Sequence, residues 1–523
     1  MDKADGARRR GRITKDLAAA TAVLLATGAG SAYAADPARV AADGYVASHQ
    51  KAILGEFTDF LAMPDVATTV PDVERNAAHV TELLKQRGFE TRILSAGPGT
   101  PPTVYGELKT PGATRTVLFY AHYDGQPISQ KGWASEPFQP VMRTGALTAG
   151  AKTVDWRAAP TPLDPDWRIY ARAAGDDKVS IQAMLTAMDA LKAAGLKPSV
   201  NVKLFYEGEE EQGSPHLETI VERNKDLLAC DLIVMGDGPM HQSGRQQVNY
   251  GSRGVVGFTL TVFGPLRPLH DGHYGSWAPS PAVDIAHLVA DLRAENGDIT
   301  IPGFYADVRA PTEAERKALA ALPPVEAQLR HDLGIGAPVT SERLADSYFR
   351  PTLNVRSIHV GDSGEHAANA IATTAFASLD FRIVPDETPA HVRKLVEDHL
   401  RARGWFLADG TPDLATRLAH PKIVRVDWDA GSSMAVKTDL SDPAAAAATA
   451  AIERVEGAPV LRLPMVGASS GLAVIVQGLK APMVGVSIAN YDDNQHAENE
   501  NLRLGNLWDG AAVYAALLSE TRW

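Results

Sequence analysis

Residues 116–127 have the sequence Thr-Val-Leu-Phe-Tyr-Ala-His-Tyr-Asp-Gly-Gln-Pro. Residues 116–121 form a short, almost wholly apolar run, which is typical of a strand buried on both faces of a sheet. His122 and Asp124 follow where such a strand would end. In open α/β sheets ligands bind beyond the carboxyl ends of the strands, so this stretch predicts a site at that edge.

Three further apolar runs lead into acidic residues or histidine in the same way. They are residues 200–206 before Glu207-Gly-Glu-Glu-Glu211, residues 232–235 before Asp237, and residues 483–488 before Asp492, Asp493 and His496. Apolar residues at helical spacing over residues 178–194, with Gly195 as a stop, predict a helix that Asp176 and Asp177 precede. Strands and helices that alternate in this order predict an α/β fold.

The acidic residues at these strand ends would repel one another unless cations compensated their charge. Histidine together with aspartate and glutamate suits Zn²⁺, Mn²⁺ or Co²⁺ better than Ca²⁺, which prefers oxygen ligands. Each segment alone has an ordinary alternative. A histidine after a strand is more often structural, and an acidic triplet such as Glu209-Glu210-Glu211 is usually a solvated helix start. All the segments taken together, in one order, favour a metal site.

Five separated motifs resemble those of the M20 metallopeptidases and occur in the family's order. They are His122-Tyr-Asp124-Gly-Gln-Pro127 for H-x-D-x-x-P, Gly175-Asp-Asp-Lys178 for D-D-K, Tyr206-Glu-Gly-Glu-Glu-Glu-Gln-Gly-Ser214 for E-G-x-E-E-x-G-S, Asp237, and His496-Ala-Glu-Asn-Glu500. The resemblance runs from about Tyr45 to the C-terminus. It is closest to the cytosolic nonspecific dipeptidase and carnosinase branch, which Trp-Ala-Ser-Glu-Pro-Phe at residues 133–138 also resembles.

The resemblance implies an α/β fold with two parts. One is a di-metal peptidase catalytic domain, a mixed sheet flanked by helices, and the other is an inserted α/β sandwich that serves as lid and dimerisation domain. We expect the first catalytic segment at residues 35–250, the lid at 251–432 and the second catalytic segment at 433–523. Strand-like residues 254–262 and 375–383 and helical stretches at 281–295 and 388–403 fit such an insertion.

Carried over residue by residue, the resemblance implies two divalent metal ions per subunit, with Zn²⁺ expected first and Mn²⁺ or Co²⁺ as alternatives. The implied ligands are His122, Asp176 and Asp237 for one ion, and Asp176, Glu211 and His496 for the other. Glu210 falls at the position of the general base. Asp124 falls at the position of the residue that orients the His122 imidazole.

In the resembled family the lid also contributes to the active site. His270 matches a histidine that reaches into the partner's active site to support the oxyanion, and Arg382 matches the residue that binds the substrate's terminal carboxylate. Ser469 aligns with a glycine-rich loop that contacts the same carboxylate. Without the resemblance, His270 is as well explained as an exposed loop residue, and an arginine within a strand more often forms a structural salt bridge.

Composition and charge limit the other classes. With 63 acidic and 51 basic residues, the chain has a formal net charge of −12. A protein that binds nucleic acid needs a basic face for the phosphates, so this balance argues against that class. Cys230 is the only cysteine, which excludes an intrachain disulfide and a cysteine-based zinc cluster.

The first 34 residues have the layout of a secretory signal. Arginines at positions 8, 9, 10 and 12 precede an apolar run at residues 17–27, and Ala32-Tyr-Ala34 supplies an A-x-A cleavage site. The run is too short to span a hydrocarbon core about 30 Å thick. We therefore expect cleavage near Ala34 and a periplasmic or secreted protein without a stable membrane anchor; the alternative is an uncleaved amphipathic helix.

The strand-end residues and the resemblance to the M20 family together predict a two-metal hydrolase that cuts the amide bond of dipeptides or short peptides. The resemblance also implies a homodimer. Deacylation of N-acyl amino acids is a close alternative because both kinds of substrate present a carboxylate. A catalytically inactive module that binds peptide or metal is the alternative of another class, which the presence of Glu210 and of all five ligand positions disfavours. The long, proline-containing stretch at residues 143–167 departs from the family pattern and borders Asp176, so we expect it to affect specificity.

Overall fold

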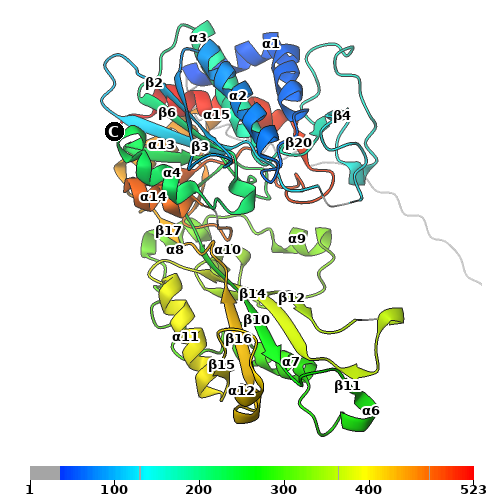
Figure 1. The fold of residues 1–523 in the computed structure, drawn as a ribbon. Helices are drawn as coiled ribbons and strands as arrows, with labels where there is room; N and C mark the ends of the chain where they lie inside the picture. The colour runs from blue at the N-terminus through cyan, green and yellow to red at the C-terminus, as the bar shows by residue number, and fades with distance from the viewer. Residues whose placement is uncertain (1–35, 129–130, 363, 470) are drawn as a thin grey trace, which may run out of the picture. The chain divides into compact units, whose positions relative to one another are not determined.

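A computed structural model describes residues 36–128, 131–362, 364–469 and 471–523 (Figure 1). Within these ranges the chain forms an eight-stranded sheet, a five-stranded sheet and three smaller sheets, with helices packed against both large sheets. The α/β fold expected from the sequence is confirmed. The predicted secretory signal and its cleavage site near Ala34 lie outside the described residues and stay predictions. No helix in the described part of the chain is long and apolar enough to cross a lipid bilayer.

The eight-stranded sheet is mixed: its four central strands are parallel, and β8 and β18 form a second parallel pair at one edge. Its order is β1 (Glu90–Leu94), β2 (Thr103–Leu108), β6 (Asn201–Glu207), β3 (Thr116–His122), β7 (Leu232–Met235), β19 (Met483–Gly485), β8 (Gln247–Asn249), β18 (Leu461–Leu463). Strand β3 pairs in parallel with β6 and β7, and β7 pairs in parallel with β19. The strands expected at residues 116–121, 200–206 and 232–235 are confirmed, whereas the one expected at 483–488 ends three residues earlier.

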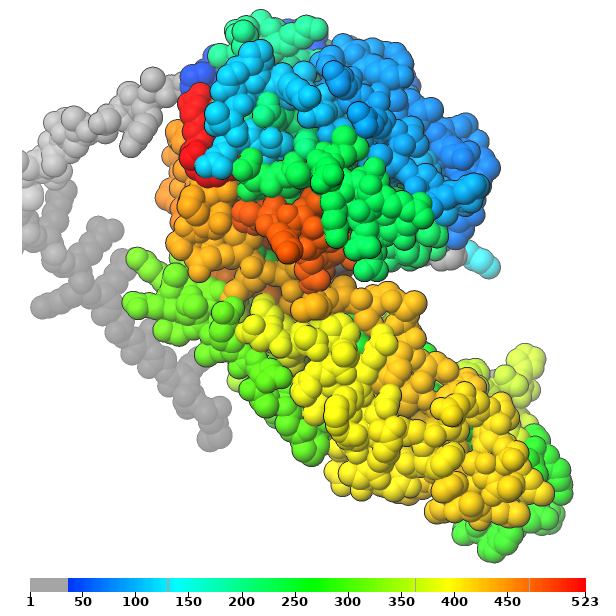
Figure 2. Space-filling model, turned by 60° about the vertical axis from the view of Figure 1, so that its left-hand side comes forward, coloured from blue at the N-terminus to red at the C-terminus, as the bar shows by residue number. Residues whose placement is uncertain are grey.

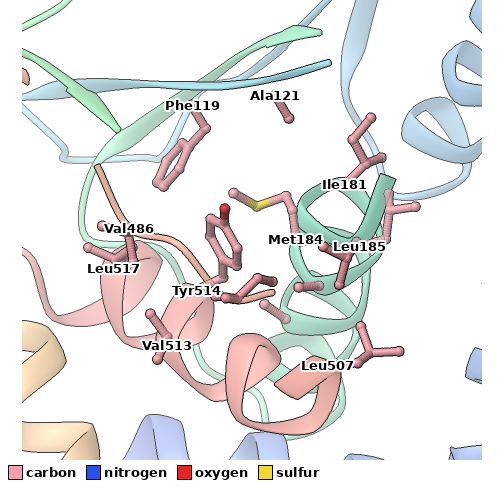
Figure 3. Close-up of a cluster of buried hydrophobic side chains, with 14 of the residues drawn as sticks. Phe119, Ala121, Ile181, Met184, Leu185, Val486, Leu507, Val513, Tyr514 and Leu517 are labelled. Atoms are coloured by element: carbon pink, nitrogen blue, oxygen red, sulfur yellow. The ribbon is translucent and has the colours of Figure 1, made fainter. Parts of the chain in front are cut away.

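Both faces of this sheet are covered, because alternate residues of β3 enter different cores. Phe119 and Ala121 pack into the larger core with helices α1 (Pro37–Leu61), α3 (Lys178–Ala193) and α15 (Leu504–Glu520). Figure 3 shows Phe119 and Ala121 opposite Met184 of α3 and Tyr514 of α15. On the other face, helices α4 (Leu217–Arg223) and α14 (Leu472–Leu479) cover Leu118 and Tyr120 (Figure 1). The helix predicted at residues 178–194 is thus confirmed as α3, and Gly195 follows it in the left-handed conformation that glycine adopts readily.

The five-stranded sheet contains the lid strands that the sequence predicts. Its order is β12 (Thr352–His359), β14 (Thr374–Ile383), β10 (Gly254–Phe263), β16 (Ile423–Trp428), β15 (Phe406–Leu407). Helices α7 (Pro281–Leu292) and α11 (Pro389–Ala402) bury their apolar sides in its core, where Phe258, Phe304 and Phe381 stack on one another. Figure 2 shows the yellow segment that includes α11 at the surface of this part of the chain.

The chain enters and leaves the five-stranded sheet at neighbouring points. Strand β9 (Gly251–Ser252) directly precedes β10 and pairs antiparallel with β17 (Val436–Lys437), which follows β16. An insertion whose two ends are tied together in this way can be added to a fold without disturbing its core. The pairing supports an inserted unit; the boundaries predicted at residues 250 and 432 stay predictions.

The remaining elements include two longer helices, α2 and α13, and several short helices and strands. A three-stranded sheet joins β20 (Asn501–Arg503), β5 (Arg168–Tyr170) and β4 (Val141–Arg143), so the stretch at 143–167 lies between two of its strands. The others are α2 (Val70–Gln86), α5 (Lys225–Leu228), α6 (Asp271–Tyr274), α8 (Glu313–Ala320), α9 (Glu326–Asp332), α10 (Leu344–Ser347), α12 (Leu414–Ala419), α13 (Pro443–Glu456), β11 (Leu269–His270), β13 (Ala370–Ile371) and three 3₁₀ turns, at Leu147–Ala149, Glu210–Gln212 and Gly364–His366.

Glu387, in the turn between β14 and α11, gives a pH-dependent test of this part of the fold. Its carboxylate accepts the N–H of Val384 at 2.8 Å and its side chain is buried. Burial raises the pKa of Glu387 to about 7. Because the pKa in the folded state is above the unfolded value of about 4.3, the contribution to stability is complete below that value and is lost as the pH rises toward 7.

We therefore expect Glu387→Gln, which cannot ionise, to melt at a higher temperature than the wild type at pH 8. At pH 4 the two proteins should melt at nearly the same temperature, because Glu387 is then protonated in both states. Differential scanning calorimetry across this range checks the expectation. An equal difference between the two proteins at every pH would contradict it.

Candidate metal centre

Four segments bring the predicted metal-site residues other than His496 to the carboxyl edge of the eight-stranded sheet, and the segment after β19 adds His496. His122 is the last residue of β3, and the 3₁₀ turn that begins at Glu210 follows β6. Asp237 comes two residues after β7, and Asp176 precedes α3 by two residues. Parallel strands end at the same edge, so β3, β6 and β7 necessarily place their following residues near one another.

The first group of possible metal ligands consists of His122, Asp176 and Asp237. One ligand atom from each lies within 4.8 Å of the others. Nε2 of His122 is 3.0 Å from Oδ1 of Asp176 and 4.0 Å from Oδ1 of Asp237. The side chains of His122 and Asp176 are almost completely buried, so this group lies beneath the surface.

The second group consists of Asp176, Glu211 and His496, again with their ligand atoms within 4.8 Å of one another. Nε2 of His496 lies 3.2 Å from Oδ2 of Asp176 and 3.2 Å from Oε2 of Glu211. Asp176 therefore turns one carboxylate oxygen to each group. All five residues that the sequence predicts as ligands are brought together in the arrangement that a bridging aspartate requires.

The charges of the two groups are out of balance. Burial raises the pKa of Asp237 to about 7, and the negative charge of Asp176 adds to the shift. Hydrogen bonds to Asp176 and Glu211 raise the pKa of His496 to about 11. Burial lowers the pKa of His122, but its contacts with Asp124 and Asp176 outweigh burial and hold the pKa well above its ordinary value. Asp237, His122 and His496 thus all hold their protons more strongly than usual. This indicates an excess of negative charge around them, which divalent cations would neutralise.

The donor set fits such cations. It contains imidazole nitrogen and carboxylate oxygen, a combination that suits Zn²⁺, Mn²⁺ and Co²⁺. Nδ1 of His122 lies 3.1 Å from the carbonyl oxygen of Asp124, which can only accept a hydrogen bond. Nδ1 therefore carries a hydrogen, and Nε2 is the nitrogen that faces Asp176 and Asp237. This orientation is typical of a histidine that binds a metal.

Asp124 also fixes the turn that carries Glu210 and Glu211. Its side chain is completely buried and accepts the N–H of Glu210 at 3.1 Å and the N–H of Glu211 at 3.0 Å. The sequence predicts that Asp124 orients His122. The structure adds that this aspartate also orients the turn after β6, and that its carbonyl oxygen lies closer to Nδ1 of His122 than its carboxylate does, at 3.1 Å against 3.5 Å.

Glu210 lies next to Glu211 in the same turn and interacts electrostatically with residues of both groups. Burial raises the pKa of Glu210 well above its ordinary value; the positive charge of His122 opposes this shift, and the negative charges of Asp237 and Glu211 add to it. A carboxylate that holds a proton more readily than free glutamate suits a general base that works near neutral pH.

The lid residues lie outside the two ligand groups. His270 is the last residue of β11, and its side chain is 60% exposed and its ring lies 4.5 Å from the ring of His273. Arg382, on β14, has its Nε 3.2 Å from Oδ1 of Asp380. This is the structural ion pair that the sequence leaves open as the alternative for Arg382.

Arg253 is a candidate residue that sequence analysis misses. Its Nε donates to the carbonyl oxygen of Gly467, in the loop that holds Ser469. Burial lowers the pKa of Arg253 to about 10, and the positive charge of Arg382 adds to the shift. Arg253 also lines a cavity of about 350 Å³. The sequence marks Arg253 only by its place just before the strand expected at residues 254–262, where the predicted insertion starts.

The fold and the site define a class. A mixed sheet with an inserted second sheet, and two ligand groups that share one aspartate at the carboxyl edge, are the features of a metal-dependent hydrolase with two neighbouring metal positions.

The family model for Peptidase family M20/M25/M40 matches residues 118–520, and the chain belongs to this family. It is 26% identical over 426 residues to the Cys-Gly metallodipeptidase dug1 of Schizosaccharomyces pombe, covering 80% of this chain and 83% of that protein. It is 25% identical over 535 residues to the Beta-Ala-His dipeptidase of Homo sapiens, covering 98% of each. The M20 family metallo-carboxypeptidase Sso-CP2 from Sulfolobus solfataricus has a similar structure, with a TM-score of 0.74, 26% identity, and coverage of 90% of this chain and 99% of that one. The protein is thus a metallopeptidase, as the sequence predicts.

The shared aspartate makes metal stoichiometry a test of the two groups. We expect the metal-stripped wild type to take up two Zn²⁺ ions per chain, and His496→Ala to take up one ion tightly because the first group stays complete. Asp176→Ala should bind Zn²⁺ most weakly, because it removes a ligand from both groups.

Isothermal titration of the stripped proteins with Zn²⁺ measures these stoichiometries. His216→Ala is the matched control, because His216 pairs with Glu209 at 2.9 Å and belongs to neither group. Equal losses in His496→Ala and Asp176→Ala would show that Asp176 is not shared.

Proposed function

We propose that the protein hydrolyses the amide bond of dipeptides or other short peptides with two divalent ions bound at the two ligand groups, Zn²⁺ in the first place and Mn²⁺ or Co²⁺ as alternatives. The observation that carries the proposal is the position of Asp176, which offers one oxygen to each group. The relatives support the choice of substrate, because the names Cys-Gly metallodipeptidase and Beta-Ala-His dipeptidase both describe cleavage of dipeptides.

The ligands would be His122, Asp176 and Asp237 on one side, and Asp176, Glu211 and His496 on the other. Two divalent ions close together supply Lewis acidity and lower the pKa of a water toward about 7. Glu210 accepts the proton of the attacking water and delivers it to the leaving nitrogen. Asp124 keeps Glu210 in place, because it accepts the N–H of that residue.

The terminal carboxylate of the substrate would bind at Arg382 and at the loop that holds Ser469. Arg382 keeps part of its guanidinium for a ligand, because only its Nε is hydrogen-bonded to Asp380 among the described contacts. Oγ of Ser469 is buried without a hydrogen-bond partner among the described residues. Arg253 adds a second guanidinium near Arg382, and a carboxylate between them would relieve their mutual repulsion.

His270 would complete the site of a second copy in a homodimer. The outer edge of the five-stranded sheet is a candidate interface, because residues 354–359 of the edge strand β12 are exposed. Val355 and Ile358 on this strand and Phe376 on β14 are exposed apolar residues. An unpaired edge with apolar side chains is a site where a second copy can bind.

The protein would work outside the cytoplasm. The proposal rests on the basic residues, the apolar run and Ala32-Tyr-Ala34 in the first 34 residues. Expression of the full chain in a bacterium with fractionation of the periplasm, followed by N-terminal sequencing, tests it. A protein that keeps its first residues in the cytoplasm would refute export.

The first functional prediction concerns Glu210. Purified protein beginning at Ala35, loaded with Zn²⁺ or Mn²⁺, should cleave members of a dipeptide panel, and Glu210→Ala should lower kcat by about 10²–10⁴-fold because it removes the general base. The variant should still bind two ions, since Glu210 belongs to neither ligand group.

Glu218→Ala, an exposed glutamate on α4, is the control and should keep wild-type activity. Substantial turnover by Glu210→Ala would remove Glu210 from the mechanism. Cleavage of N-acetyl amino acids with no cleavage of dipeptides would replace the peptidase with a deacylase.

The second functional prediction concerns His270. The mature protein should be a dimer by light scattering at micromolar concentration, and His270→Ala should lower kcat by about 10²–10³-fold, the typical cost of losing an oxyanion donor. The melting temperature should stay unchanged, because the side chain is exposed.

Mixed dimers separate action on the partner from action within one chain. When His270→Ala and Glu210→Ala proteins are mixed and allowed to exchange subunits, activity should return, because one site then has both an intact base and a histidine from the other subunit. His273→Ala is the control for a change in the same loop. If the mixture stays inactive, His270 does not act on the partner's site.

A further inference from the structure

Glu500 joins the two chain segments that carry Asp176 and His496. It lies four residues after His496, in the loop before β20, and it is completely buried. Its Oε1 accepts the N–H of Gly175 at 3.0 Å and the N–H of Asp176 at 3.1 Å. Its Oε2 accepts Nη1 of Arg172 at 2.8 Å and the N–H of Ala173 at 3.0 Å.

These four bonds occupy the hydrogen-bonding capacity of the carboxylate, since an ionised glutamate has about four lone-pair sites. Arg172 supplies the compensating positive charge and is itself 1% exposed, with the ring of Trp133 at 5.1 Å from its guanidinium. A buried carboxylate is tolerated when it is paired and fully hydrogen-bonded. Glu500 therefore cannot turn away or move without leaving several donors unpaired.

The turn at residues 172–176 also lies close to Asp493. A β carbon on Gly175 would lie 2.8 Å from Oδ2 of Asp493, which leaves no room for a side chain at that position. The backbone of this turn is thus hydrogen-bonded to Glu500 and packed closely against Asp493, and Asp176 is its last residue. The orientation of the Asp176 carboxylate follows from the position of that backbone.

We propose that Glu500 is a positioning residue that holds Asp176 in the orientation needed to bridge two metal ions and links this orientation to the loop of His496. The inference rests on the proposed function, because it assumes that the two ligand groups bind metal. Glu500 touches neither group through a ligand atom; it acts through the N–H groups of residues 173–176.

Glu500→Gln tests the proposal with almost no change in size. A glutamine amide presents N–H groups to donors that need an acceptor, and it leaves Arg172 without its buried partner. We expect the affinity for Zn²⁺ to fall by about 10–100-fold, as is typical when a residue that supports a metal ligand is replaced. At saturating Zn²⁺ we expect kcat to fall while KM changes little, because the substrate does not contact Glu500.

Glu500→Asp is the second variant and keeps the test decisive if the glutamine variant fails to fold. It retains the charge and can keep some of the hydrogen bonds, so Zn²⁺ affinity should fall less than in Glu500→Gln. Glu387→Gln is the matched control, because Glu387 is also buried and accepts a backbone N–H but lies in the five-stranded sheet region. It should bind Zn²⁺ as the wild type does.

Titration of the metal-stripped mature protein with Zn²⁺ gives the affinities, and the visible spectrum of the Co²⁺-loaded protein reports on ligand geometry. Variants with a lower melting temperature but wild-type Zn²⁺ affinity and Co²⁺ spectrum would reduce Glu500 to a structural role and overturn the proposal. These measurements do not depend on hydrolysis. A wild type that binds two ions but cleaves no dipeptide would refute the proposed substrate and leave the role of Glu500 decided by the titration.

Discussion

The constraint on which the site depends is the gathering of several carboxylates at one edge of a sheet. Two unit charges 4 Å apart repel by about 4 kcal/mol at an effective dielectric constant of 20. The fold nevertheless places Asp176, Asp237 and Glu211 around two histidines, because parallel strands β3, β6 and β7 end together. Divalent cations would make this arrangement favourable, and because the two ligand groups share Asp176, its carboxylate would compensate part of the charge of both ions.

The same kind of hydrogen bonding supports both groups of possible metal ligands. A buried carboxylate that is not itself a ligand accepts N–H groups from a turn that carries ligands. Asp124 does so for Glu210 and Glu211, and Glu500 does so for Gly175 and Asp176. Backbone N–H groups are better anchors than side chains, because fixing them also fixes the direction in which the following side chain leaves the chain. The ligands are therefore oriented by hydrogen bonds to the backbone as well as by their own contacts.

Local patterns predict the strands, whereas the ligand set comes from the resemblance to the M20 family. Residues 116–121 are almost wholly apolar because β3 is buried on both faces. His122 is expected as a ligand because residues 122–127 match the H-x-D-x-x-P motif, and the structure places it beside Asp176 and Asp237. The roles of Glu500 and Arg253 are not visible at this level. Arg172 and Glu500 are 328 residues apart in the chain, and no periodicity or spacing relates such positions. Arg253 acquires its role only from the charge of Arg382 on the neighbouring strand.

The two large sheets supply different residues to the proposed site. The eight-stranded sheet and the loops around it supply every proposed metal ligand and the proposed base, so a single chain would hold both ions and the base. The five-stranded sheet supplies positive charge at Arg382, close to the point where the chain enters the insertion through Arg253. His270 lies on β11, among the elements of the insertion, and belongs to neither ligand group. In the proposed function, recognition of the substrate's carboxylate would therefore lie near the base of the insertion, and His270 would contribute to the site of a second copy.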